Sequence, residues 1–69
     1  MKYRNRLRVI RAERRITQLD AAVSSGMNKT RFWTIENGYA APTDKERAAI
    51  AKALGVAESE AFPAEAIAS

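Results

Sequence analysis

The positions at which helices must end constrain this sequence more than any other feature. Its three glycines, Gly26, Gly38 and Gly55, each close a stretch in which apolar residues recur with helical spacing. Glycine adopts the left-handed conformation that ends a helix without steric strain. None of the intervening stretches alternates apolar and polar residues as a half-buried strand does. The sequence therefore predicts an all-α fold built from short helices.

Residues that cap helices mark where the predicted helices begin. Thr17, Asn28 and Thr43 each stand directly before a periodic stretch, and their side chains can accept hydrogen bonds from the free N–H groups of a first turn. Thr43 and Glu46 together fit a capping box. Four or five helices are predicted, at residues 5–14, 18–25, 29–36, 44–54 and, for one last turn, 58–62. The residues expected in their core are Leu7, Ile10, Ile16, Ala21, Ala22, Met27, Phe32, Ile35, Ile50, Ala51 and Leu54, with Val23 as a further candidate.

The length of 69 residues allows one domain with a small core. The predicted domain spans residues 1–69, with its folded part at 4–63 and a frayed tail at 64–69. The chain has neither cysteine nor histidine, which excludes disulfides, thiolate chemistry and the commonest metal ligand and general base. Its carboxylates do not cluster, and it has no readable nucleophile–base pair or phosphate-binding loop. We therefore predict no enzyme activity, no metal site and no cofactor.

The sequence also bears on where the protein works. Its basic N-terminus is not followed by the uninterrupted apolar stretch of a signal peptide. No apolar run approaches the ~18 residues needed to span a membrane. Small chains without cysteine are usually intracellular, so the sequence predicts a cytoplasmic protein with no membrane partner.

Charge is distributed unevenly along the chain. Residues 1–34 hold nine arginines and lysines against two acidic residues, a net charge of +7, whereas residues 35–69 hold three against six, a net charge of −3. A one-sided basic field favours a polyanionic partner, with nucleic acid ahead of a membrane surface. The alternative is a basic side that is solvated and binds nothing.

The helices predicted at 18–25 and 29–36 are joined by a turn centred on Gly26. Two short helices with so short a turn have the proportions of a helix-turn-helix. In that arrangement Ala22 lies where the helices cross, which requires a small side chain, and Phe32 attaches the second helix to the core. The opposite side of that helix then points outward, and a DNA major groove is wide enough to admit it.

The segment from Ile16 to Gly38, "ITQLDAAVSSGMNKTRFWTIENG", resembles the helix-turn-helix of the Cro and phage-repressor family, the XRE-like regulators. The matching features are Thr17-Gln18, Ala22, Gly26, Asn28, Phe32, Ile35 and the closing Glu36-Asn37-Gly38. "NRLRVIRAERRITQ" is similar to the family's first helix, "PTDKERAAIAKALGV" to its fourth, and "ESEAFP" to its short fifth. The resemblance covers residues 4–63 and implies a lambda-repressor-like DNA-binding domain.

The resemblance implies roles for individual residues. Gln18 would hold a phosphate and brace the recognition helix, Asn37 would contact the backbone across the groove, and Arg11 would pair with Glu36. The positions that read base edges in the family are occupied by Lys29, Thr30, Trp33 and Thr34. Arg31 lies further round the helix, where a phosphate is the favoured contact. The predicted DNA-binding residues are Thr17, Gln18, Asn28, Lys29, Thr30, Arg31, Trp33, Thr34 and Asn37.

The sequence departs from the family pattern at several positions. Arg15 stands where relatives carry the glycine that closes the first helix, and a left-handed non-glycine residue costs about 1 kcal/mol. Whether that helix ends in the usual turn is thus left open. Ser25 replaces an apolar residue and Ala21 a larger one, while Leu19 and Val23 are apolar where relatives are polar. Leu19 and Val23 indicate either excess exposed apolar area or a small rotation of the helix predicted at 18–25.

Trp33 has three interpretations: it leans on the edge of the core beside the preceding helix, it lies in a DNA groove against a thymine methyl or the sugar edges, or it contacts a protein. Because tryptophan offers one N–H donor on a large apolar body, in the groove it would select shape and methyl groups.

The predicted function is a sequence-specific, double-stranded DNA-binding transcriptional regulator, with helix 29–36 in the major groove. It would act as a homodimer on a pseudo-palindromic operator. Because the chain ends just after the fifth helix, the expectation is a Cro-like regulator, with dimerisation through Val56, Ala57, Phe62 and Ile67. Val56 and Phe62 are interpreted as either core residues or dimer contacts. The alternative is a protein-interaction module on the same fold, an antitoxin or co-regulator with weak, non-specific DNA binding.

Overall fold

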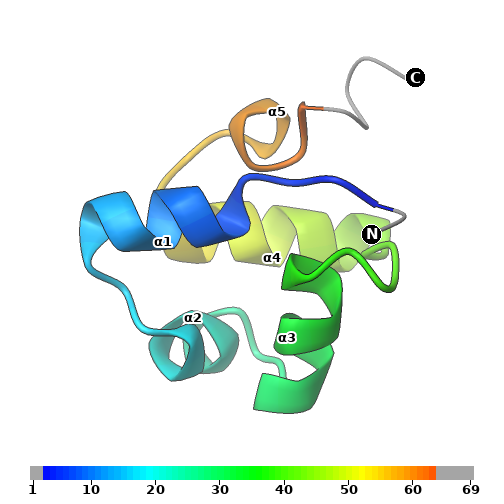
Figure 1. Ribbon diagram of the computed structural model, residues 1–69, viewed down its shortest axis with the longest axis horizontal. Helices are drawn as coiled ribbons and strands as arrows, with labels where there is room; N and C mark the ends of the chain where they lie inside the picture. Colours follow the sequence, from blue (N-terminus) through cyan, green and yellow to red (C-terminus); the bar gives the residue numbers. More distant parts are fainter. Residues whose placement is uncertain (1–2, 64–69) are drawn as a thin grey trace.

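The computed structural model describes residues 3–63, which form five α-helices (Figure 1). The helices are α1 (Leu7–Arg14), α2 (Gln18–Ser24), α3 (Lys29–Glu36), α4 (Asp44–Leu54) and α5 (Glu58–Ala61). The described part of the chain contains no strand, so the all-α prediction is confirmed. The predicted helix bounds are also close: α1 begins two residues late, at Leu7, and α2 and α5 each end one residue early.

The helices are arranged around the pair α1 and α4, which contact each other at the centre of the molecule (Figure 1). α2 packs against both α3 and α4. In the view of Figure 1, α2 and α3 lie on one side of the central pair and α5 lies on the other. The two helices of the predicted motif therefore share one side of the domain.

The core consists of one apolar cluster to which all five helices contribute. Its largest fully buried side chains are Phe32, Leu7, Ile35, Ile50 and Leu54. Ala22 is also fully buried, as expected where α2 meets α3. Ile16, Met27 and Val56 are partly buried against the cluster. The core predicted from helical spacing is thus confirmed except for the candidate Val23, which is 68% exposed because it faces away from the cluster.

Phe62 belongs to this core as well, because its side chain is only 2% exposed. Of the two interpretations of Phe62, a core residue or a dimer contact, its burial favours the core. Val56 packs partly against the core, whereas Ala57 is exposed. Ile67 and the predicted tail at 64–69 lie outside the described residues.

The predicted N-caps are present at three helices. The Thr17 hydroxyl accepts a hydrogen bond from the Asp20 N–H at 3.0 Å, and the Asn28 Oδ1 accepts one from the Arg31 N–H at 2.7 Å. At α4 both halves of the Thr43 capping box form. These bonds satisfy N–H groups that have no partner inside a helix, and they explain why α2, α3 and α4 begin where the sequence predicted.

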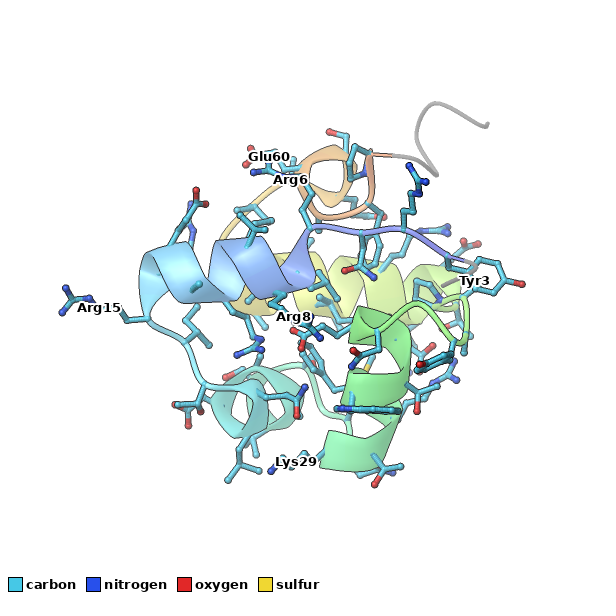
Figure 2. The ribbon with its side chains drawn as sticks, viewed as in Figure 1. Tyr3, Arg6, Arg8, Arg15, Lys29 and Glu60 are labelled. Atoms are coloured by element: carbon cyan, nitrogen blue, oxygen red, sulfur yellow. The ribbon has the colours of Figure 1, made fainter. Side chains whose placement is uncertain are left out.

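Arg15 ends α1 in a left-handed conformation, with φ 56° and ψ 41°. It is the one non-glycine residue with positive φ in the described chain. The turn closes with the Ile16 N–H donating to the Arg11 carbonyl at 2.9 Å, so the helix ends in a left-handed turn despite a strain of about 1 kcal/mol. The Arg15 side chain extends away from the body of the domain (Figure 2).

Candidate nucleic-acid interface

The two sides of α3 differ sharply in exposure. Phe32 and Ile35 are fully buried on the inner side, which fixes the rotation of the helix about its axis. Lys29, Thr30 and Trp33 are exposed on the outer side. Figure 2 shows Lys29 at the N-terminal end of α3, with its side chain on the side of α2. Helix α3 thus presents a row of cationic, hydroxyl and aromatic groups to solvent.

A buried carboxylate fixes the other end of α3. The Glu36 side chain is 1% exposed, and its two oxygens accept hydrogen bonds from Arg11 Nε at 2.6 Å and Arg11 Nη2 at 3.0 Å. A third Arg11 donor, Nη1, reaches the Ile16 carbonyl at 3.0 Å. A bidentate arginine–carboxylate pair has defined geometry as well as charge compensation. It therefore holds α1 against the C-terminal end of α3.

Gln18 joins the same carboxylate from α2. Its Nε2 donates to Glu36 Oε1 at 2.9 Å, so three helices meet at one buried group. The bond fixes the amide at the start of α2, and Gln18 still has a second N–H and its carbonyl oxygen. The arrangement fits the bracing role that the resemblance implied for this residue.

Arg31 does not point to the outer side of α3. Its Nε and Nη2 donate to the two Glu46 carboxylate oxygens at 2.9 and 2.8 Å, which connects α3 to the first turn of α4. The hydrogen bonds from Arg31 are the main reason that the pKa of Glu46 falls from 4.5 to about 2, against an opposing effect of burial. The same contact raises the pKa of Arg31. A phosphate at Arg31 would have to share a guanidinium that already holds a carboxylate.

This pair predicts a pH dependence of stability. Because the folded-state pKa of Glu46 lies below its ordinary 4.5, its contribution is complete above pH 4.5 and is lost as the pH falls toward 2. We expect the partly exposed pair to contribute about 1–2 kcal/mol near neutral pH. Urea unfolding of the native protein and of Glu46→Gln, which retains a capping-box side chain, should differ by that amount at pH 7 and converge near pH 2. A difference that does not change with pH would contradict the assignment.

Trp33 is 46% exposed and stacks on Tyr39, with ring centroids 5.6 Å apart and planes inclined by 29°. Tyr39 itself is 65% exposed. The indole therefore does not insert into the core. It borders a shallow hollow of about 190 Å³ that is also lined by Gln18, Lys29 and Thr30. The hollow lies between the start of α2 and the outer side of α3.

The C-terminal end of α3 receives side chains that sequence reasoning did not assign to it. The Asn5 Nδ2 donates to the Ile35 carbonyl at 2.9 Å while its Oδ1 accepts from the Leu7 N–H at 3.0 Å. Asn37 Oδ1 accepts from Arg8 Nη2 at 2.6 Å. These contacts join residues about thirty positions apart, so no local pattern announces them.

The remaining predicted site residues lie near the exposed outer side of α3 or form hydrogen bonds that stabilise the fold. Thr17 and Asn28 are occupied as N-caps, and the half-buried Thr34 hydroxyl donates to the Thr30 carbonyl at 2.8 Å. Leu19 and Val23 are 54% and 68% exposed, so they form excess apolar area on α2. Ser25 fits its position because its hydroxyl bonds the Ala21 carbonyl at 2.7 Å.

Within residues 3–63 no group of His, Cys, Asp and Glu could hold a metal ion, and no helix is long and apolar enough to cross a membrane.

Comparisons with known proteins bear on which family the chain belongs to. Searches of curated proteins and of solved structures found no significant match. A family comparison matches residues 3–62 to the helix-turn-helix domain. Together with the packed pair α2 and α3, this match shows that the chain belongs to the helix-turn-helix domain family, whose fold is a DNA-binding one.

Proposed function

We propose that this protein is a transcriptional regulator that binds double-stranded DNA sequence-specifically, with α3 in the major groove. The observation that carries the proposal is the outer row of α3. Lys29, Thr30 and Trp33 are exposed there, while Phe32 and Ile35 occupy the inner side completely. Because burial of the inner side fixes the rotation of α3, the helix would present the same side chains to each DNA site that it binds. Lys29 can donate to guanine, and the Thr30 methyl can contact a thymine methyl.

Phosphate contacts would set the position of that helix. Gln18 is fixed by Glu36, the last residue of α3, and retains amide groups for a phosphate. The net charge of +7 on residues 1–34 supplies attraction to the DNA backbone. These contacts add affinity without sequence information, so discrimination rests on Lys29, Thr30, Trp33 and Thr34.

Such a regulator would act in the cytoplasm, without a cofactor, as a homodimer on a pseudo-palindromic operator. Half-site centres about 34 Å apart would place both copies of α3 on one side of the duplex. The alternative is a protein-interaction module, favoured by the exposed apolar area of Leu19, Val23, Trp33 and Tyr39. Exposed apolar patches commonly mark surfaces that bind partners.

A binding titration followed by Trp33 fluorescence tests the two functions. Near 0.15 M salt, the DNA upstream of the gene would be compared with a shuffled duplex of equal composition. We expect a preference of about 10³ or more for the native region, as specific regulators have. Equal, weak binding to both duplexes would contradict the regulator and favour the interaction module.

Single substitutions distinguish residues that read base edges from residues that position the protein on the phosphate backbone. Lys29→Ala should change the preferred base at one position by about 1–3 kcal/mol, because it removes a donor to a base edge. Gln18→Ala should weaken binding to all sequences alike. The measurement is a selection from randomised duplexes, with circular dichroism to verify folding. Unchanged preference in both Lys29→Ala and Thr34→Ala would show that α3 does not read the bases.

A further inference from the structure

Two arginines on one side of α1 contact the end of α3. Arg8 and Arg11 are three residues apart, so they project from the same side of the helix. Arg11 bonds Glu36 and Arg8 bonds the next residue, Asn37. The environments differ, since Arg11 is mostly buried against a carboxylate and Arg8 is exposed against a neutral amide. Arg8 thus holds a defined position without losing its charge to a partner.

In the Arg8–Asn37 pair, the arginine has more N–H groups left over for a further hydrogen bond than the asparagine has. Asn37 Oδ1 accepts from Arg8 Nη2 at 2.6 Å, and Asn37 Nδ2 donates to the Trp33 carbonyl at 2.9 Å. Asn37 is left with one amide N–H. A guanidinium has five N–H groups, and Arg8 uses one of them on Asn37. The other N–H groups can form charge-assisted bonds with phosphate oxygens.

The position of Arg8 suits the DNA backbone more than a base. Lys29 and Trp33 are four residues apart on the outer side of α3, and Asn37, the C-cap of the helix, follows at the same interval. From Lys29 to Asn37 the helix axis rises about 12 Å, which is comparable to the width of a major groove. A group at the far end of that row reaches the groove wall, where the phosphates are.

The charges at this end of α3 also favour a contact between Arg8 and the DNA backbone. The C-terminal end of a helix carries partial negative charge, which disfavours an approaching phosphate. The ion pairs formed within residues 3–63 involve Arg11, Arg31 and Arg47, and not Arg8. Arg8 therefore supplies the positive charge that a phosphate would need there.

We infer that Arg8 is a phosphate-binding residue of the DNA interface and that Asn37 positions its guanidinium. The inference rests on the proposed function. It changes the role expected of Asn37, because the backbone contact at this end of α3 passes mainly to a residue of α1. Arg8 adds affinity for every sequence and does not choose among bases.

The test compares two neighbouring arginines. Arg6 is also exposed and lies close to Arg8 in sequence, but its backbone N–H bonds the Ala61 carbonyl at 2.9 Å on the α5 side. Figure 2 shows Arg6 beside α5, whereas Arg8 lies between α1 and α3. Arg8→Gln should lower affinity about five- to tenfold on operator and shuffled duplexes alike. It should also reduce the slope of log K against log salt by about 0.9. Arg6→Gln, which removes the same charge, should leave the slope unchanged.

A double-mutant cycle tests the positioning role of Asn37. Asn37→Ala should weaken DNA binding in the native background but have little further effect in Arg8→Gln, because the group it orients is gone. Equal losses in both backgrounds would show that Asn37 binds the phosphate itself and would overturn its positioning role. Thermal unfolding of each variant separates these effects from lost stability.

The outcomes distinguish this inference from the proposed function. Equal effects of Arg8→Gln and Arg6→Gln, or a changed base preference in Arg8→Gln, would overturn the role of Arg8. If Lys29→Ala still alters preference in that case, the proposed function stands. A native protein without salt-dependent DNA binding would overturn both.

Discussion

Glu36→Ala is expected to lower the free energy of unfolding by about 3–5 kcal/mol, because it breaks a buried ion pair from one side. The substitution leaves the Arg11 guanidinium, whose side chain is 15% exposed, without its carboxylate. It also removes the acceptor of Gln18. For a domain of 69 residues this is a large part of the total stability. Chemical denaturation followed by circular dichroism measures the change.

The control replaces both members of the pair. Arg11→Met combined with Glu36→Leu removes the charges together, and we expect it to recover much of the loss because no buried charge is left without a partner. Gln18 still loses its acceptor in the double variant, so recovery should be incomplete. A loss below about 1 kcal/mol in Glu36→Ala would mean that the carboxylate is not buried as described.

Phe62→Ala is the second substitution with a large expected effect, about 3–5 kcal/mol of destabilisation. Phe62 is 2% exposed and belongs to the core cluster, so truncation leaves a cavity that the small domain cannot fill. Urea unfolding gives the stability, and sedimentation velocity gives the state of association. We expect a less stable protein whose self-association, where folded, is unchanged.

Leu19→Ala provides the comparison for Phe62→Ala. Leu19 is also apolar but is 54% exposed on α2, so its truncation should change stability by less than about 0.5 kcal/mol. A Phe62→Ala variant of native stability with weakened self-association would contradict the core assignment and return Phe62 to an interface.

Local rules were enough to predict most of the fold. Thr17, Asn28 and Thr43 begin helices because an N-cap needs only its own side chain and the next turn. Helical spacing likewise identified the inner residues Phe32 and Ile35, because a helix must bury its apolar side. The resemblance supplied the pairing of Arg11 with Glu36, which the structure contains.

Contacts between distant residues could not be predicted in the same way. The bond from Asn5 to the Ile35 carbonyl spans 30 positions, and the bond from Arg8 to Asn37 spans 29. Both depend on how α1 crosses the end of α3, which no local pattern encodes. The sequence left Phe62 open between core and dimer contact for a related reason, since one apolar residue after a single helical turn fits a core and an interface equally well. The DNA-binding roles of the α3 residues remain predictions.

The segment before α1 and the first turn of α1 are attached to the end of α3 at several points. The Tyr3 N–H donates to the Gly38 carbonyl at 3.1 Å, Asn5 bonds the Ile35 carbonyl, and Arg8 bonds Asn37. An affinity tag or fluorescent label joined ahead of Tyr3 would therefore act on the helix proposed to enter the groove. The affinity measured with such a fusion would include the effect of the tag on α3 as well as the binding of the native protein. Attachment beyond α5, on the side of the domain away from α2 and α3 (Figure 1), would leave that helix undisturbed.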